Sequence, residues 1–137
     1  MANADVRQGT VEIGIVVADL DAMMAFYGDV LGLEYVGEIQ LPGALMKRYL
    51  LSDTVIKLVH QDRPLEGSHP PGGMRAPIAG LRYLTLRVDG VEEKVARCEA
   101  AGCRVPRATF EYRPGVPMAI VEDPEGNSIE LITRTPG

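Results

Sequence analysis

The chain has 137 residues, of which 46% are hydrophobic and 24% are charged, and its formal net charge is −5. This size and composition are typical of a single soluble globular domain that spans residues 1–137 and needs no disulfide or structural metal. No apolar run approaches the roughly 18 residues that cross a bilayer, so we expect no membrane partner. The scattered basic residues of an acidic chain also argue against nucleic acid, which leaves a small-molecule ligand as the expected partner.

Two local features bear on the expected cellular compartment and on the role of the cysteines. Asp5 and Arg7 stand where an export signal requires an apolar run, so we expect a cytoplasmic protein. The only cysteines are Cys98, within a predicted helix, and Cys103, at the entry to the next predicted strand. We expect both to be packing residues rather than parts of a disulfide or a metal site.

The first half of the chain predicts a strand, a helix and three more strands. Residues 11–17 form a β-branched apolar run that indicates a strand. Asp19 is a predicted N-cap, apolar residues follow at helical spacing as far as Leu31, and Gly32 stands where a left-handed residue ends a helix. Strands are then predicted over residues 33–39, 45–51 and 55–60, the last two joined by a turn at Ser52 and Asp53.

The second half predicts the same order of elements. Residues 83–88 indicate a strand, residues 91–101 a helix closed by Gly102, and residues 103–109 a strand. Two further strands, 118–121 and 128–133, flank residues 123–127, whose Pro and Gly suit a tight hairpin. Residues 61–80, rich in Pro and Gly, form a predicted linker that is also placed to border a binding site.

The two halves also match residue by residue. Residues 13–17 correspond to residues 84–88, and residues 55–58 correspond to residues 128–131. A duplicated module is the simplest explanation. We therefore expect module 1 over about residues 11–60, the linker over 61–80 and module 2 over about residues 81–134.

Three segments of the sequence carry a family resemblance. Residues 14–20 (GIVVADL) and 25–33 (AFYGDVLGL) resemble the opening module of the vicinal-oxygen-chelate superfamily, which contains glyoxalase I, bleomycin-resistance proteins and extradiol dioxygenases. Residues 123–131 (DPEGNSIEL) are similar to its terminal hairpin. The resemblance covers about residues 11–133 and implies an α+β fold. In that fold two β-α-β-β-β modules form a curled mixed sheet around a cavity, with the helices outside.

Alternation of side chains along each strand predicts which residues face this cavity. In the last strand, Ile129 and Leu131 pack on a helix, so Glu130 faces inward. Met46 and Met118 are further candidates to line a ligand cavity. Of the arginines at or beside the fifth strand, only Arg87 is turned inward, and Arg75 and Arg82 are expected in solvent. The residues that this parity turns inward are Glu12, Gly14, Val16, Lys57, Tyr83, Thr85, Arg87, Ser128, Glu130 and Ile132.

The resemblance also implies where a metal would bind. Metal-dependent members place four ligands, drawn from His, Glu and Gln, on four inward strand positions, and these match Glu12, Lys57, Tyr83 and Glu130. A lysine ammonium repels a divalent cation and tyrosine is an uncommon ligand, so we expect no metal cofactor. Lys57 is expected instead to keep Glu12 and Glu130 ionised, with the Tyr83 hydroxyl completing the network.

The sequence leaves two functions open. One is a non-catalytic binder that resembles bleomycin-resistance proteins and holds a small organic ligand with Thr85, Arg87, Met46 and Met118. The other is a lyase or isomerase, related to glyoxalase I or an epimerase, that acts by proton abstraction at the four matched positions, either with a metal or with the assistance of Lys57. Its general base would be Glu130, with Lys57 or Tyr83 stabilising the oxyanion.

Three further expectations complete this interpretation. The same four polar residues are also compatible with a polar network that has no catalytic role. An oxygenase is disfavoured because the chain lacks the ligands that iron requires. The resemblance implies a homodimer.

Overall fold

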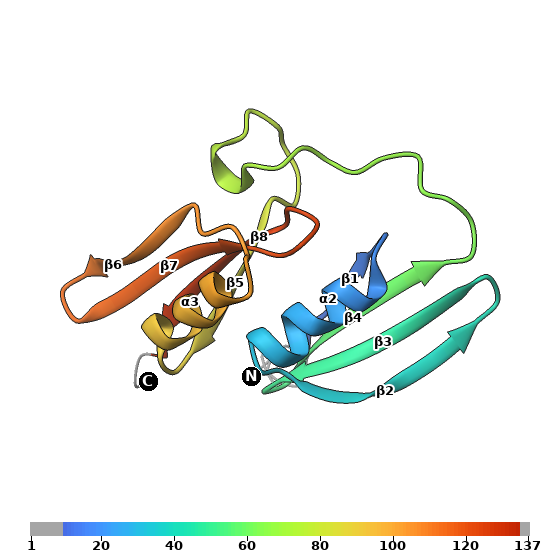
Figure 1. Ribbon diagram of the computed structural model, residues 1–137, viewed down its shortest axis with the longest axis horizontal. Coiled ribbons are helices and arrows are strands. Elements are labelled where there is room, and N and C mark those ends of the chain that lie inside the picture. Colours follow the sequence, from blue (N-terminus) through green and yellow to red (C-terminus); the bar gives the residue numbers. More distant parts are fainter. Residues whose placement is uncertain (1–9, 135–137) are drawn as a thin grey trace, which may run out of the picture. The chain divides into compact units, whose positions relative to one another are not determined.

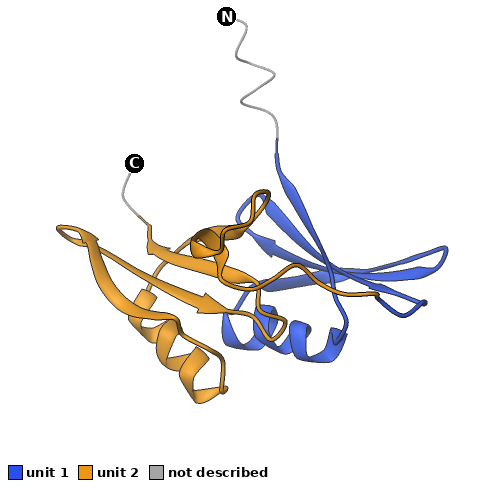
Figure 2. Cartoon of the chain, turned by 90° about the horizontal axis from the view of Figure 1, so that it is seen from above, with its two compact units in different colours: residues 1–65 blue, residues 66–137 orange. Residues whose placement is uncertain are grey.

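The computed structural model of the chain describes residues 10–134, which fall into two compact units divided after Leu65 (Figure 2). This boundary lies within the linker predicted over residues 61–80. Asp5 and Arg7, on which the expectation about export depends, lie outside the described residues. Within residues 10–134, no helix has the length and apolar character needed to cross a membrane.

Unit 1 contains a mixed sheet whose strand order is β1-β4-β3-β2 (Figure 1). Its strands are β1 (Glu12–Val16), β2 (Glu34–Leu41), β3 (Ala44–Leu51) and β4 (Thr54–Gln61). The first strand pairs in parallel with the last, and the other neighbours are antiparallel. A helical segment, α2 (Leu20–Met24) followed by η1 (Ala25–Val30), joins β1 to β2 and packs against β4. The predicted β-α-β-β-β order is therefore confirmed for this half.

The helical segment of unit 1 differs from the prediction in its second half. It begins as expected, because an Asp19 carboxylate oxygen accepts a hydrogen bond from the Ala22 N–H at 3.1 Å. From Ala25 onward it widens into a π-helix, in which the Leu31 N–H donates to the Phe26 carbonyl at 2.9 Å. This wider turn contains the adjacent aromatic residues Phe26 and Tyr27, both of which are buried.

Unit 2 repeats the arrangement with the strand order β5-β8-β7-β6. Its elements are β5 (Tyr83–Val88), α3 (Val91–Ala100), β6 (Arg107–Arg113), β7 (Val116–Glu122) and β8 (Ser128–Thr133). A short 3-10 turn, η2 (Gly73–Arg75), interrupts the predicted linker. Again the first strand pairs in parallel with the last, while β6, β7 and β8 are antiparallel. The α+β fold class and the two repeated modules are thus confirmed.

One strand of unit 2 was predicted at the wrong place. The prediction started a strand at Cys103, whereas β6 begins at Arg107. The Cys103 N–H donates instead to the Cys98 carbonyl at 2.9 Å and so completes the end of α3. Pro106 has no N–H to offer a neighbouring strand, so regular pairing starts only after it.

Strand register makes the duplication visible at single residues. Glu12 on β1 lies opposite Val55 on β4, and Tyr83 on β5 lies opposite Ser128 on β8. Lys57 lies two residues after Val55 on β4, and Glu130 lies two residues after Ser128 on β8. Because side chains two residues apart share a sheet face, Lys57 lies on the same face as Val55, and Glu130 on the same face as Ser128. The two modules thus hold their polar candidates at equivalent positions.

The opposite face of each sheet forms a core with its helix. Ile56 and Leu58 of β4 are fully buried in unit 1, as are Ile129 and Leu131 of β8 in unit 2. This confirms the predicted alternation in the last strand. Cys98 on α3 is buried in the same core and is a free thiol, and burial raises its pKa to about 11.

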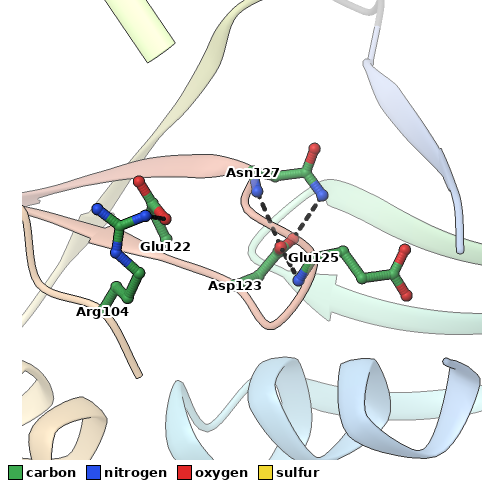
Figure 3. A network of polar contacts seen from close by, with 5 residues as sticks. All are labelled: Arg104, Glu122, Asp123, Glu125 and Asn127. Atoms are coloured by element: carbon green, nitrogen blue, oxygen red, sulfur yellow. Dashed lines mark hydrogen bonds and ion pairs between the residues drawn. The ribbon is translucent and has the colours of Figure 1, made fainter. Parts of the chain in front are cut away.

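Asp123 organises the hairpin between β7 and β8 (Figure 3). One carboxylate oxygen accepts hydrogen bonds from the N–H groups of Glu125 and Asn127, at 3.0 and 2.9 Å. The other accepts one from the Asn127 side-chain amide at 2.8 Å. The aspartate is 4% exposed, so these bonds are shielded from water and fix the point at which β8 starts.

Candidate functional site

Unit 2 contains a pocket of about 290 Å³ on the sheet face that α3 does not cover. We call it the unit-2 pocket. It is formed by side chains of β5, β6, β7 and β8 and by the η2 segment. Its lining residues are Gly72, Met74, Arg75, Tyr83, Pro106, Arg107, Ile120, Glu122, Ser128 and Glu130.

Glu130 and Tyr83 are the two predicted site residues that line this pocket. Strand register places Thr85 directly opposite Glu130, and the Thr85 hydroxyl donates a hydrogen bond to Glu130 Oε1 at 2.8 Å. This bond fixes the orientation of the carboxylate and occupies one of its two oxygens. Tyr83 is 43% exposed, so its ring is accessible to a ligand.

Two arginines that were not predicted to lie at the pocket contribute positive charge to its lining. Arg75 comes from η2, and Arg107 comes from the start of β6, where its guanidinium lies 3.5 Å from the centre of the Phe110 ring. The lining residue Glu122 is 5% exposed and is paired with Arg104 at 3.3 Å (Figure 3). Because Arg104 compensates Glu122, Arg75 and Arg107 outnumber the one remaining lining carboxylate, Glu130, and make the lining receptive to an anionic group.

The η2 segment is attached to the pocket by Arg82. Its guanidinium donates to the carbonyl oxygens of Gly73, at 3.3 Å, and Pro70, at 2.7 Å, and lies 3.4 Å from His69 Nδ1. The expectation that Arg82 is solvated was therefore wrong, because the linker carbonyls fold back onto it. Arg75 is exposed as expected, but it lines the pocket.

Gly73 makes the closest approach between this segment and the sheet. A Cβ at this position would lie 2.7 Å from Ser128 Oγ and 2.8 Å from Ser128 Cβ, and the backbone φ is +53°. Both the contact and the dihedral angle require glycine. The sequence Pro-Pro-Gly-Gly therefore places Met74 and Arg75 in the pocket wall.

The other two matched positions lie in unit 1. Lys57 Nζ is 3.4 Å from Glu12 Oε1, and the two side chains are 28% and 54% exposed. The lysine ammonium thus faces the carboxylate to which the sequence analysis assigned it. Convergence of this pair with Tyr83 and Glu130 in one cavity stays a prediction.

The four matched positions do not fit a divalent metal. Only the two glutamates offer ligands that such a metal prefers, and Lys57, as an ammonium ion, has no lone pair to donate. Within residues 10–134, no group of three or more His, Cys, Asp or Glu side chains is arranged to hold a metal.

The remaining predicted ligand-binding residues lie outside the lining of the unit-2 pocket. Arg87 is exposed on β5, and Met46 is half-buried on β3 of unit 1. Met118 is 7% exposed and packs in an apolar cluster with Val116 and Ile132. A ligand contact by any of these three residues stays a prediction.

Comparison with known proteins supports the fold and the family. A family model described as the Glyoxalase/Bleomycin resistance protein/Dioxygenase superfamily matches residues 9–131. No curated protein matches the chain.

Several solved structures are similar over most of their length. A trypanothione-dependent glyoxalase I from Leishmania major is 24% identical, with a TM-score of 0.70, 91% of this chain covered and 86% of the other. A glyoxalase/bleomycin resistance protein from Streptomyces sp. CB03234 is 24% identical, with a TM-score of 0.66 and coverages of 90% and 98%. A glyoxalase family protein from Bacillus cereus is 18% identical, with a TM-score of 0.78 and coverages of 90% and 92%. At these identities the structures establish the fold alone, and it is the family model, matched over nearly the whole chain, that shows that the protein belongs to the glyoxalase/bleomycin resistance protein/dioxygenase superfamily.

Proposed function

We propose that this protein binds a small organic anion in the unit-2 pocket without using a metal. The observation that carries the proposal is the composition of the lining, where Arg75 and Arg107 face the same space as Tyr83, Ser128 and Glu130. Guanidinium groups bind carboxylates through paired, charge-assisted hydrogen bonds. The pocket volume of about 290 Å³ corresponds to a small ligand.

The rest of the lining determines which anions fit. Met74, Pro106 and Ile120 supply apolar contact for a hydrocarbon or aromatic part of the ligand. Glu130 accepts hydrogen bonds and repels a second negative charge, so a ligand with one anionic group and one hydroxyl is favoured over a dianion. The mismatch between the four matched positions and a divalent cation supports binding that is independent of metal.

Binding is tested by titrating isotopically labelled protein with acetate, lactate and benzoate and recording amide NMR shifts. We expect saturable shifts at Arg75, Tyr83 and Ser128 for at least one carboxylate, and none for benzyl alcohol. Arg107→Met should weaken binding by about tenfold because a charge-assisted contact is lost. Arg113→Met, on the same strand but outside the lining, is the matched control. Equal affinities of the two variants, or the absence of saturation for all three carboxylates, would contradict the proposal.

Independence from metal is tested separately. The purified protein is incubated with equimolar Zn²⁺, Ni²⁺ or Mn²⁺, dialysed, and analysed for metal content. We expect substoichiometric metal and unchanged carboxylate binding. Retention of one metal ion per chain would contradict this part of the proposal.

A second candidate function is proton abstraction by Glu130, acting as a lyase or isomerase. It is favoured by one observation, namely that the Thr85 hydroxyl orients the Glu130 carboxylate while this side chain lines a pocket. A fixed carboxylate next to a substrate carbon is suited to general base catalysis, and an arginine or Tyr83 would stabilise the developing oxyanion.

Solvent exchange distinguishes catalysis from binding. Dihydroxyacetone in deuterium oxide is followed by proton NMR for loss of its carbon-bound protons. Catalysis predicts exchange that Glu130→Gln abolishes and Glu111→Gln, an exposed site on β6, leaves unchanged. Exchange that is equal in both variants rules out Glu130 as the base.

A further inference from the structure

Unit 1 contains a second pocket, whose lining differs from that of the unit-2 pocket. Its volume is about 340 Å³, and it lies where the α2 and η1 helical segment meets the strands β2 and β3. We call it the Tyr49 pocket. The lining residues that matter for its chemistry are Asp21, Met24, Gly28, Asp29, Tyr35 and Tyr49.

From these residues we infer that the Tyr49 pocket binds a protonated alkylamine. This inference is independent of the function proposed for the unit-2 pocket, because the two pockets share no residue. It depends on an unsatisfied hydroxyl, an aromatic pair, the local charge and the space left by a glycine.

The Tyr49 hydroxyl is the first observation. The Tyr49 side chain is 3% exposed, and none of residues 10–134 forms a hydrogen bond with its hydroxyl. Every fully enclosed polar side-chain atom in that part of the chain does have a partner. Because the Tyr49 hydroxyl has no such partner, its oxygen is not fully enclosed and reaches the pocket. A ligand that donates a hydrogen bond would satisfy it there.

The aromatic pair is the second observation. The rings of Tyr35 and Tyr49 lie 5.4 Å apart with an interplanar angle of 59°. Both residues line the pocket, and the negative face of an aromatic ring attracts ammonium groups. Met24 adds an apolar, adaptable contact for the hydrocarbon part of the ligand.

Charge is the third observation. Among residues 10–134, the charged side chains that line the pocket are those of Asp21 and Asp29, and both are acidic. Asp29 already takes part in another interaction, so the charge on which the inference depends is that of Asp21. The Asp29 charge lies close enough to Tyr49 to contribute, after burial, to a raised pKa of its hydroxyl. Lys47, the ammonium near Tyr35 and Tyr49, is paired with Glu38, which compensates its charge. The lining therefore favours a cation over an anion.

The shape of the pocket depends on Gly28. A Cβ on Gly28 would lie 3.1 Å from Tyr49 Cε1 and 3.5 Å from the Tyr49 hydroxyl oxygen. The missing methyl group leaves the hydroxyl accessible from the helix side. Among residues 10–134 the pocket is lined by two carboxylates, and Asp29 already has another interaction, so a divalent metal would lack ligands, whereas an alkylammonium ion needs few contacts.

The test uses n-butylammonium chloride as the probe, n-butanol as its neutral isostere and amide NMR as the readout. We expect saturable shifts at Gly28 and Tyr49 with n-butylammonium. Affinity for n-butanol should be at least about tenfold weaker, since it lacks the charge. Equal affinities for the two probes, or no saturation with n-butylammonium, would overturn the inference.

Variants separate the specific contacts from general attraction to an acidic surface. Tyr49→Phe keeps the ring and removes the hydroxyl, and should weaken binding several-fold. Asp21→Asn should weaken it by a similar factor, whereas Asp53→Asn, in the exposed β3–β4 turn, is the matched control for loss of one charge. Unchanged melting temperatures establish that the variants fold. If Asp21→Asn and Tyr49→Phe both bind as Asp53→Asn does, the site is not the one inferred.

Discussion

Replacing Gly73 with alanine is expected to lower the free energy of unfolding through two separable effects. The first is conformational, because the φ of +53° lies in the left-handed region, where an L residue costs about 1–2 kcal/mol. The second is steric, because the new methyl group would lie 2.7 and 2.8 Å from Ser128 Oγ and Cβ. Overpacking of this kind costs roughly 1–3 kcal/mol. Together they predict a loss of roughly 2–5 kcal/mol.

A double-mutant cycle separates the two effects. Ser128→Gly removes both clashing atoms, so Gly73→Ala in that background should cost only the conformational part, about 1–2 kcal/mol. Gly115→Ala is the matched control in the same unit, because its φ is +77° and nothing lies within 4 Å of the position that its methyl group would occupy. Its cost should equal the conformational part alone.

Urea unfolding followed by circular dichroism measures the free energy of unfolding of the four proteins in the cycle and of the Gly115→Ala control, and amide hydrogen exchange on β8 reports unit 2 specifically. Gly73→Ala should also weaken carboxylate binding, since it displaces the segment that carries Met74 and Arg75. The reasoning is refuted if Gly73→Ala costs no more than Gly115→Ala, or if Ser128→Gly relieves none of its cost.

Three further predictions concern other parts of the chain. Asp123→Ala should lower the free energy of unfolding by roughly 2–4 kcal/mol, because three hydrogen bonds to a buried carboxylate are lost, and urea unfolding measures this. The Cys98 thiol should be alkylated by iodoacetamide far more slowly than the thiol of the unfolded chain at pH 8. The pKa of this thiol is about 11 in the folded chain and near 9 in the unfolded chain, so its contribution to stability is present below pH 9 and is lost between about pH 9 and 11. Cys98→Ala should abolish this dependence of stability on pH. Lys57→Met should change stability by less than about 1 kcal/mol, because both side chains of its ion pair with Glu12 are partly exposed to solvent, and a larger loss in thermal unfolding would contradict this.

The sequence predicted those elements whose signals are local. Strands with alternating or continuous apolar residues were found within a few residues of their true ends, and β5 and β8 at their observed bounds. Asp19 and Gly32 delimit the first helical segment because capping depends on single residues. The internal repeat then fixed the order of the elements in both halves.

The π-helix and the start of β6 were missed because the hydrogen bonds that define them are not visible in apolar spacing. An i to i+5 bond from Leu31 to Phe26 changes the turn without changing which residues are apolar. At β6, Pro106 rather than hydrophobicity decides where pairing begins.

Only some residues of the candidate site could be predicted from the sequence. Alternation placed Glu130 and Tyr83 on a common face, because it depends only on strand parity. Arg75 and Arg107 were missed, since one lies in an irregular segment and the other at a strand start that was predicted four residues too early. For Arg75, the Gly-Gly pair that precedes it was an available signal, because such a pair permits a tight approach to a neighbouring strand.

The parallel pairing of the first and last strands in each unit has a consequence for biosynthesis. β1 finds its neighbour only after β4 has been made, and β5 only after β8. Each sheet therefore closes late, through contacts between distant parts of the chain, which slows folding. Since β4 ends at Gln61, the amino-terminal sheet has all its strands while the ribosome is still translating the carboxyl-terminal one.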